Sequence, residues 1–344
     1  MSELIQKSEH IHPAKYFKKD RNGILCMLCP HKCFLKSGQI GICKSRKNID
    51  GILYALNYGN LCAVHVDPIE KKPLYHFLPG SRTLSIATGG CNLKCLNCQN
   101  WQISQKSPEQ TSILQFTPDE IVDLALKENC TSISYTYTEP LIAYEFVYDT
   151  ALIARQKGIK NVFVTAGYIN QRPLKNLCEV MDAVNIDLKG FDAEIYKKLN
   201  GANLQEILDN LLILKHSKVW VEITNLIIPG WTDNLDVIKK MCDWLIDNEF
   251  ENNPIHFSRF MPTYKLNKEV STSVSILHII ADLAIKRGLN YVYSGNLHGD
   301  IYENTYCDNC RELLIKRQGY QVYRNQINNG ICISCNNKIQ GIWG

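Results

Sequence analysis

The chain has 344 residues, of which 45% are hydrophobic and 21% are charged, and this composition is ordinary for a soluble globular protein. That length allows one large domain with small appendages, or two medium-sized domains. The net charge of +4 neither requires a nucleic-acid partner nor excludes one. No stretch reaches the roughly 18 apolar residues that a membrane span needs, and Met1–Asp20 is too polar for a secretion signal. We therefore expect a cytoplasmic protein with no membrane segment.

Fifteen cysteines are the unusual feature of the composition. A cytoplasmic protein keeps its thiols reduced, so clustered cysteines there are more often metal ligands than disulfides. Four cysteines are isolated and are expected in the core, namely Cys62, Cys130, Cys178 and Cys242. The other eleven form three tight groups, which are Cys26, Cys29, Cys33 and Cys43; Cys91, Cys95 and Cys98; and Cys307, Cys310, Cys332 and Cys335.

Between the second and third cysteine groups, short β-rich runs alternate with longer amphipathic segments. The pattern predicts strands at Leu84–Thr88, Ser132–Thr136, Asn161–Thr165, Ala183–Asp187, Val219–Ile228, Ile255–Phe257 and Tyr291–Tyr293. It predicts helices at Pro118–Lys127, Leu141–Lys157, Pro173–Val180, Leu204–Leu214, Asn234–Asn248 and Ser273–Arg287. The first of these helices carries a clear start signal, because Thr117 is an N-cap residue directly before a proline.

Strand–helix alternation of this kind indicates a parallel sheet with helical crossovers. Some six or seven units are too many for a minimal doubly wound domain and slightly few for an eightfold barrel. We therefore expect an α/β fold built as a partial (βα)6-type barrel, with a doubly wound sheet as the second possibility. The expected division is a cysteine-rich N-terminal module with a lead-in over residues 1–80, the barrel over residues 81–300, and a small cysteine-rich module over residues 301–344.

The segment Thr88–Trp101 follows the first predicted strand and carries Cys91, Cys95 and Cys98. Three thiolates at this spacing can wrap one face of a [4Fe–4S] cluster from a single loop, which leaves one iron without a protein ligand. That iron can chelate S-adenosylmethionine (SAM) through its amine and carboxylate, and electron transfer then releases a 5′-deoxyadenosyl radical. The alternative is a zinc site or a set of buried thiols, but no further His or Cys lies close by as a fourth ligand.

The loop resembles the cluster loop of radical SAM enzymes, and Cys98-Gln99-Asn100 is similar to its counterpart in the activases of glycyl-radical enzymes. From about residue 20 to the end, the chain resembles the radical SAM component of the AmmeMemoRadiSam system. This likeness rests on Cys26–Cys33, Tyr135–Pro140, Asp187–Gly190, Ile227–Gly230, Tyr293–Asn296 and the C-terminal cysteine pairs. Two positions depart from the pattern: Asn97 replaces an aromatic residue that packs near the SAM adenine, and Ala166 replaces an Asn.

The resemblance implies that five polar residues contact SAM or support its site. Glu139 stands where the superfamily holds the SAM amino group with a carboxylate; the alternative is a surface charge before a helix. Asp187 and Lys189 resemble a pair that contacts the SAM carboxylate or ribose, and the alternative is a local salt bridge. His256 resembles a SAM-contacting histidine, with a structural role as the alternative. Asn100 would steady the cluster loop or the SAM carboxylate, or cap the following turn.

The outer cysteine groups also indicate metal sites. The C-terminal pairs Cys307-x2-Cys310 and Cys332-x2-Cys335 resemble a zinc ribbon with a hairpin between them, and structural zinc is favoured over a second cluster or a metal-free site. The N-terminal set has the spacing C-x2-C-x3-C-x9-C, with His31 as an alternative ligand. It fits zinc or an auxiliary [4Fe–4S] cluster, and zinc is slightly favoured because nothing in the sequence favours redox activity.

We therefore expect an oxidoreductase-like radical SAM enzyme of the activating-enzyme family, which cleaves SAM at a [4Fe–4S] cluster and abstracts hydrogen from an unknown substrate. One alternative is a glycyl-radical-enzyme activase of the pyruvate formate-lyase activating type. Another is a non-catalytic, zinc-stabilised binding protein. The resemblance implies an electron donor of the flavodoxin or ferredoxin type, and Memo-like and AMMECR1-like partner proteins.

Overall fold

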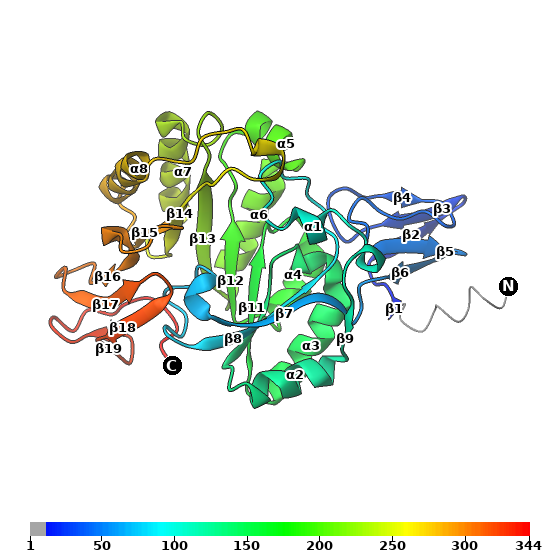
Figure 1. Ribbon diagram of the computed structural model, residues 1–344, viewed down its shortest axis with the longest axis horizontal. Helices are drawn as coiled ribbons and strands as arrows, with labels where there is room; N and C mark the ends of the chain where they lie inside the picture. Colours follow the sequence, from blue (N-terminus) through cyan, green and yellow to red (C-terminus); the bar gives the residue numbers. More distant parts are fainter. Residues whose placement is uncertain (1–11) are drawn as a thin grey trace. The chain divides into compact units, whose positions relative to one another are not determined.

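The computed structural model describes residues 12–344 (Figure 1). Residues 1–11, which hold part of the polar segment used above to argue against a secretion signal, lie outside the described residues. The chain divides into two compact units. Unit 1 comprises the described residues up to Val66 together with Thr83–Asp182, and unit 2 comprises Asp67–Arg82 and Ala183–Gly344. Within residues 12–344, every helix is too short or too polar to cross a membrane.

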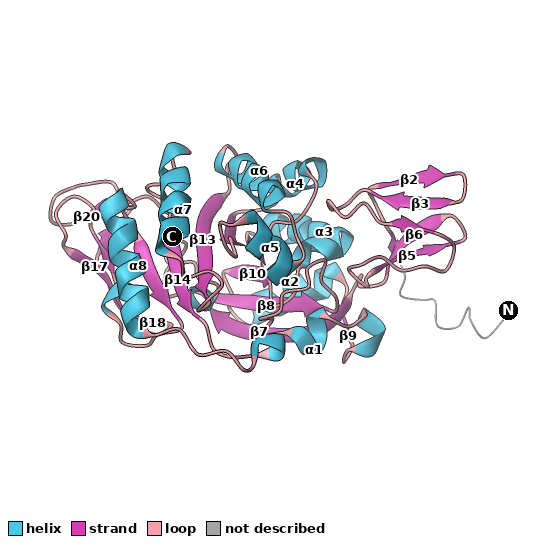
Figure 2. Ribbon diagram, turned by 90° about the horizontal axis from the view of Figure 1, so that it is seen from above, coloured by secondary structure: helices cyan, strands magenta, loops and turns pink. Residues whose placement is uncertain are grey.

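Unit 1 begins with two small antiparallel sheets that hold the first cysteine group and lie next to each other (Figure 2). One sheet has the order β2-β3-β4, with bounds Phe17–Asp20, Gly23–Cys26 and Phe34–Leu35. The other has the order β1-β6-β5, with bounds His12–Pro13, Ile52–Ala55 and Arg46–Ile49. The strands have four residues or fewer, which is too short for alternation of apolar and polar residues to reveal them in the sequence.

The rest of unit 1 is built around three parallel strands. The central strand β10 pairs in parallel with β8 and with β11, and Ser132 stands opposite both Thr83 and Lys160. The strand order is β11-β10-β8-β7-β9, with bounds Lys160–Thr165, Ser132–Tyr135, Arg82–Thr88, Asn60–Pro68 and Leu114–Gln115. The helical segments are α1 (Trp101–Ser104), η2 (Pro108–Gln110), α2 (Pro118–Lys127), η3 (Pro140–Ala143), α3 (Tyr144–Gln156) and α4 (Gln171–Cys178).

Helix starts follow the local sequence closely. The Thr117 hydroxyl accepts a bond from the Glu120 amide, while the Glu120 carboxylate accepts one from the Thr117 amide at 2.7 Å, so the expected N-cap is part of a capping box. The segment predicted as one helix from Leu141 is instead divided. A 3₁₀ turn capped by the Glu139 carboxylate comes first, and α3 begins only at Tyr144. The cause of this division lies in the site described below.

Unit 2 contains a second run of parallel strands, each paired with the next: β12 (Ala183–Asp187), β13 (Trp220–Ile227), β14 (Ile255–Arg259) and β15 (Val292–Gly295). Its helical segments are η1 (Ile69–Lys71), α5 (Ala193–Asn200), α6 (Leu204–Lys215), α7 (Leu235–Asp247), η4 (Tyr264–Leu266) and α8 (Val274–Arg287). Helices α7 and α8 pack side by side (Figure 1). Helix α5 was not predicted from the sequence, although Asp192 caps its start and left-handed Gly201 ends it.

The C-terminal part of unit 2 is a small β-rich module. After η5 (Ile301–Glu303) it contains β16 (Thr305–Tyr306), β17 (Leu313–Gln318), β18 (Gln321–Asn325), β19 (Ile327–Asn328) and β20 (Ile331–Cys332). The antiparallel pairing of β17 with β18 confirms the predicted hairpin. The module shares its core with β15, because Leu314 and Ile315 belong to one buried cluster with Tyr291 and Tyr293.

These observations confirm a mixed α/β fold with parallel strands joined by helices. All seven predicted strands are present, and so are the six predicted helices, although the one predicted from Leu141 is divided into η3 and α3; two elements have the predicted bounds and the ends of the others shift by a few residues. Closure of the strands into a partial barrel, and the three-part domain division, remain predictions.

Candidate cluster and cofactor site

The loop that leaves β8 carries the central cysteine triplet, and a glycine fixes its path. Gly90 has a left-handed φ of +99°, and a Cβ at this position would lie 2.3 Å from the Ser45 hydroxyl and 2.4 Å from the Cys43 carbonyl oxygen. The Gly90 amide donates to the Ile103 carbonyl at 3.0 Å. The loop is therefore closed on itself and pressed against the N-terminal cysteine module.

The three cysteines of this loop are reduced and partly buried. The Leu93 amide donates to Cys91 Sγ at 3.3 Å, and Cys98 Sγ lies 3.2 Å from the Ser104 hydroxyl. Burial raises the pKa of Cys91 well above its usual value, and the nearby Glu139 carboxylate and the other two thiols add to this rise. Hydrogen bonds to ligand sulfurs are a standard means of tuning an iron–sulfur cluster.

Glu139 follows the end of β10 and lies inside the protein, where it is only 2% exposed. The Glu139 carboxylate accepts bonds from the Leu141 amide at 3.1 Å, from the Ala166 amide at 2.9 Å and from the Thr165 hydroxyl. Glu139 therefore joins the end of β10 to the end of β11 and also starts η3, which explains the divided helix. Glu139 is therefore not a surface charge, which was the alternative that the sequence left open.

The cluster loop is bonded to the same strand end through Asn100. The Asn100 side-chain amide donates to the Tyr137 carbonyl at 2.7 Å, and it makes no cap bond to α1. Tyr137 has a left-handed φ of +65°, a conformation that costs energy for a residue other than glycine and often marks a functional site. The Thr138 hydroxyl donates to the Thr88 carbonyl at 2.8 Å. These bonds hold the cysteine loop and the Glu139 segment together within unit 1.

Asp187 and Lys189 lie at the end of β12 in unit 2, and they contact each other. Lys189 Nζ donates to Asp187 Oδ2 at 2.8 Å, and both side chains are partly exposed. The local salt bridge that the sequence analysis left open is therefore present. The contact of this pair with SAM remains a prediction.

His256 belongs to a buried network in unit 2 that the sequence analysis missed. Its Nε2 lies 2.8 Å from Glu222 Oε2, and its ring packs against the rings of Tyr75 and Tyr293. The Glu222 carboxylate also accepts bonds from the backbone amides of Tyr75 and His76 at 2.9 and 2.7 Å. These contacts favour the structural alternative for His256, while its role as a SAM ligand stays a prediction.

Electrostatics fit a charged Glu222 within this network. Burial alone would raise the pKa of Glu222, but its interaction with His256 and the bond from the Tyr75 amide lower it below its usual value. A glutamate in the middle of the apolar segment Val219–Ile228 was the sequence signal for a buried partner.

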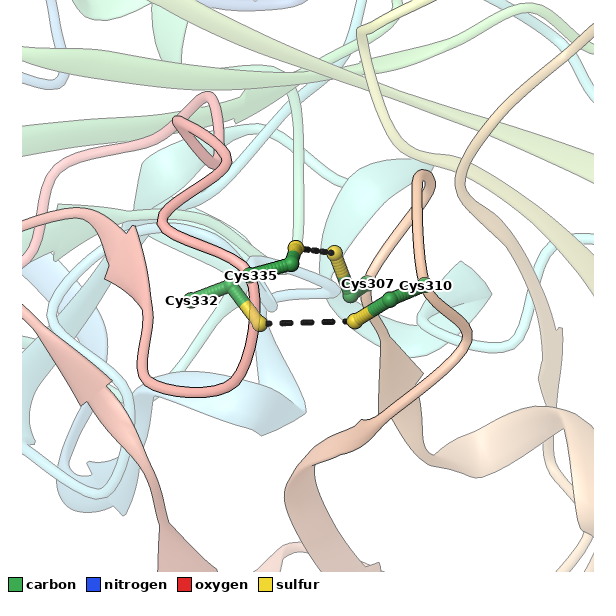
Figure 3. A group of neighbouring side chains, drawn as sticks. All are labelled: Cys307, Cys310, Cys332 and Cys335. Carbon is green, nitrogen blue, oxygen red and sulfur yellow. Dashed lines mark hydrogen bonds between the residues drawn. The ribbon is translucent and has the colours of Figure 1, made fainter.

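The C-terminal cysteines form a compact four-thiol group (Figure 3). Cys307 Sγ lies 3.6 Å from Cys335 Sγ, and Cys310 Sγ lies 3.7 Å from Cys332 Sγ. Four thiolates that bind one zinc ion at about 2.3 Å in a tetrahedron stand about 3.8 Å apart. The group therefore has the dimensions of a site for one metal ion.

The N-terminal cysteines also converge, although less tightly. Cys26, Cys29, Cys33 and Cys43 all line one pocket in unit 1. Among the described residues, the C-terminal group is the one set of three or more metal-binding side chains whose ligand atoms all lie within 4.8 Å of one another. The N-terminal group and the central triplet are both wider than this limit.

Comparisons with known proteins agree with the prediction made from the cysteine loop. Residues 85–245 match the model of the radical SAM superfamily, and this range contains Cys91, Cys95 and Cys98. An uncharacterized protein of Methanocaldococcus jannaschii is 46% identical over 326 residues, which cover 94% of this chain and 97% of that protein. The pyruvate formate-lyase 1-activating enzyme of Escherichia coli K12 is 26% identical over 173 residues, covering 49% of this chain and 70% of that enzyme.

Among solved structures, Streptococcus suis SuiB bound to S-adenosylmethionine aligns with a TM-score of 0.51 at 14% identity, covering 70% of this chain and 56% of that chain. At this identity the likeness concerns the fold alone. The chain therefore belongs to one family with the Methanocaldococcus protein, and it contains a domain, residues 85–245, that matches the radical SAM superfamily and is related to the pyruvate formate-lyase activating enzymes.

Proposed function

We propose that this protein is a radical SAM enzyme whose [4Fe–4S] cluster is held by Cys91, Cys95 and Cys98. The observation that carries the proposal is the arrangement of three reduced, partly buried cysteines on one loop inside the matched superfamily range. The donor set fits the group, because three thiolates leave one iron of such a cluster open to a small molecule. When bound, the cluster supplies the electron that cleaves SAM reductively and yields a 5′-deoxyadenosyl radical for hydrogen abstraction.

The chain's own residues would hold and orient SAM. Glu139 keeps a buried carboxylate at the end of β10, where it can attract the SAM ammonium group. Asn100 fixes the loop against this strand end through its bond to Tyr137. Asp187 and Lys189 would bind polar groups of SAM, since both side chains lie at a strand end and remain partly exposed. His256 completes the proposed set of SAM-contacting residues.

Further parts of the proposal rest on the resemblance described above. We place the SAM site in a partial (βα)6-type barrel at residues 81–300, between an N-terminal module at 1–80 and a zinc-ribbon-like module at 301–344. We assign the chain to the AmmeMemoRadiSam branch, with Memo-like and AMMECR1-like partners and a flavodoxin or ferredoxin as electron donor. Activation of a glycyl-radical enzyme is the second candidate, because the E. coli activating enzyme is a relative over half of this chain.

The decisive experiment combines metal analysis with product detection. After anaerobic reconstitution, the protein should bind iron and sulfide and should convert SAM to 5′-deoxyadenosine when dithionite is added. Cys98→Ala should abolish this conversion. The matched control Cys307→Ala should retain it and lose zinc instead. An intact cluster without 5′-deoxyadenosine would reject the enzyme, and a colourless zinc protein would support the non-catalytic alternative.

A further inference from the structure

The N-terminal cysteine group is built as a single enclosed site. Cys26 ends β3, while Cys29 and Cys33 lie in the tight connection to β4, where the Cys26 amide donates to the Cys33 carbonyl at 2.9 Å. Cys43 reaches the same pocket from the segment before β5. A Cβ on Gly41 would lie 3.8 Å from both Cys33 Sγ and Cys43 Sγ, so the glycine leaves room between these two thiols.

His31 also lines the pocket, but the four thiols supply a complete ligand set without it. Its Nε2 lies 2.7 Å from the carbonyl oxygen of Asn92, and its ring packs edge-on against Tyr168 at 5.1 Å between centroids. Leu28, Leu35 and Ile42 supply apolar walls to the pocket. Arg46 also lines the pocket. Four thiolates suit zinc and an iron–sulfur cluster equally well, so the choice must come from the spacing of the sulfur atoms.

The spacing separates the two four-cysteine groups. Thiolates that share one ion must stand about 3.8 Å apart, and the C-terminal pairs at 3.6 and 3.7 Å meet this demand. Thiolates that bind different irons of a cubane stand farther apart, because the cluster lies between them. Within residues 12–344, the N-terminal group fails the 4.8 Å limit that the C-terminal group meets, and so does the triplet assigned to the SAM cluster. The N-terminal group thus resembles the cluster triplet.

The N-terminal site is also bonded directly to the cluster loop of unit 1. Besides the bond from His31 to Asn92, the Ser45 hydroxyl donates to the Gly89 carbonyl at 3.0 Å. Lys44 Nζ donates to the Gln105 carbonyl. Asn92 and Gly89 flank Cys91 at distances of one and two residues along the chain. The two cysteine sites are therefore adjacent and held at a fixed separation.

We propose that Cys26, Cys29, Cys33 and Cys43 bind a second iron–sulfur cluster, in place of the zinc ion that was slightly favoured because nothing in the sequence favours redox activity. This site goes beyond the SAM-cleaving function, because its ligands are separate from the triplet. The proposal assigns iron to the two wide cysteine groups and zinc to the compact C-terminal group.

The test uses the full chain with Cys91, Cys95 and Cys98 all changed to Ala, reconstituted anaerobically with iron, sulfide and zinc. This variant should keep roughly four irons per chain, with about one zinc and the visible absorbance of a cluster. Adding Cys307→Ala should remove the zinc and leave that iron, which excludes iron bound at the C-terminal group. An iron-free triple variant that holds two zincs would overturn the proposal.

The wild-type protein gives a second measurement that needs no variant to fold. It should bind roughly eight irons per chain and about one zinc, whereas roughly four irons with two zincs would overturn the proposal. The outcome is separable from that of the proposed function. Loss of the second cluster would appear in the metal count, while failure of the proposed function would appear as absent 5′-deoxyadenosine in wild-type protein with an intact first cluster.

Discussion

Protonation of His76 should destabilise unit 2 in mild acid. His76 is completely buried, with Nδ1 at 2.7 Å from the Gln340 carbonyl oxygen and Nε2 at 2.7 Å from the Tyr293 hydroxyl. A carbonyl only accepts, so Nδ1 carries the proton and Nε2 accepts from the tyrosine. This neutral form uses both ring nitrogens. A second proton would place a donor against the Tyr293 hydroxyl inside the core.

The size of the effect follows from the pKa of the folded imidazole. Burial lowers the pKa of His76 to about 4, against the opposing charge of Glu222. An imidazole in the unfolded chain titrates at about 6.5. Between these values the unfolded state binds the extra proton, so stability falls as the pH falls. The difference of about 2.5 in pKa corresponds to about 3 kcal/mol, which is fully present above about pH 6.5 and lost by about pH 4.

The assay is urea unfolding of the wild type and His76→Gln between pH 7 and pH 4. The difference in unfolding free energy between the two proteins should shrink by about 3 kcal/mol over this range, because only the wild type loses the contribution of a neutral His76. Taking the difference cancels the acid sensitivity of the cysteine sites, which both proteins share. His216→Gln, at an exposed histidine, is the control for replacing a histidine outside the core. A constant difference for His76→Gln would refute the reasoning.

Three further changes test the site and its surroundings. Gly90→Ala should lower the iron content and SAM cleavage, because the added Cβ would lie 2.3 Å from a neighbouring atom. The control Gly38→Ala changes a glycine that is also left-handed but has nothing within 4 Å of the added Cβ. It should keep the iron content and SAM cleavage and lose only about 1 kcal/mol of stability. Arg46→Met should cost about 3–5 kcal/mol in urea unfolding because it leaves buried Glu145 unpaired, and adding Glu145→Leu should restore most of it. Asp187→Asn should weaken SAM binding in equilibrium dialysis by about tenfold or more, equivalent to about 1.4 kcal/mol. The loss of folding stability should be less than about 1 kcal/mol, because the ion pair with Lys189 is partly exposed. Unchanged SAM binding would mean that Asp187 serves only the salt bridge.

The parallel strands could be predicted because each is a continuous apolar run followed by an amphipathic helix. Ala183–Asp187 was predicted with its observed bounds, and Pro118–Lys127 likewise, since a capping threonine and a proline mark the helix start. The small N-terminal sheets could not be predicted, because pairs such as Phe34–Leu35 are too short to show a period. The pairing of β3 with β4 depends on the turn that carries Cys29 and Cys33, where the Cys26 amide donates to the Cys33 carbonyl.

The parts of the site whose residues are neighbours in sequence could be predicted, and the contacts between residues far apart in sequence could not. The spacing of Cys91, Cys95 and Cys98 lies within one loop, so the chemistry of the triplet could be inferred directly. The Glu222 carboxylate, in contrast, accepts from the amide of His76, which is 146 residues away. No local pattern reveals such a pairing. His256 therefore resembled a ligand in sequence, while its closest charged contact in the structure is a buried carboxylate.

Ligand type and spacing along the chain cannot distinguish a zinc ion from a cluster when both are held by four cysteines. The separation of the sulfur atoms can, because the metal–sulfur bond length and the tetrahedral angle fix it for a single ion. Sulfur pairs at 3.6 and 3.7 Å leave no space for a four-iron core among Cys307, Cys310, Cys332 and Cys335. The N-terminal group is wider than this and is bonded to the loop that carries Cys91, and both observations support the proposed second iron–sulfur centre. The metal count of the triplet variant therefore decides a question that the cysteine pattern leaves open.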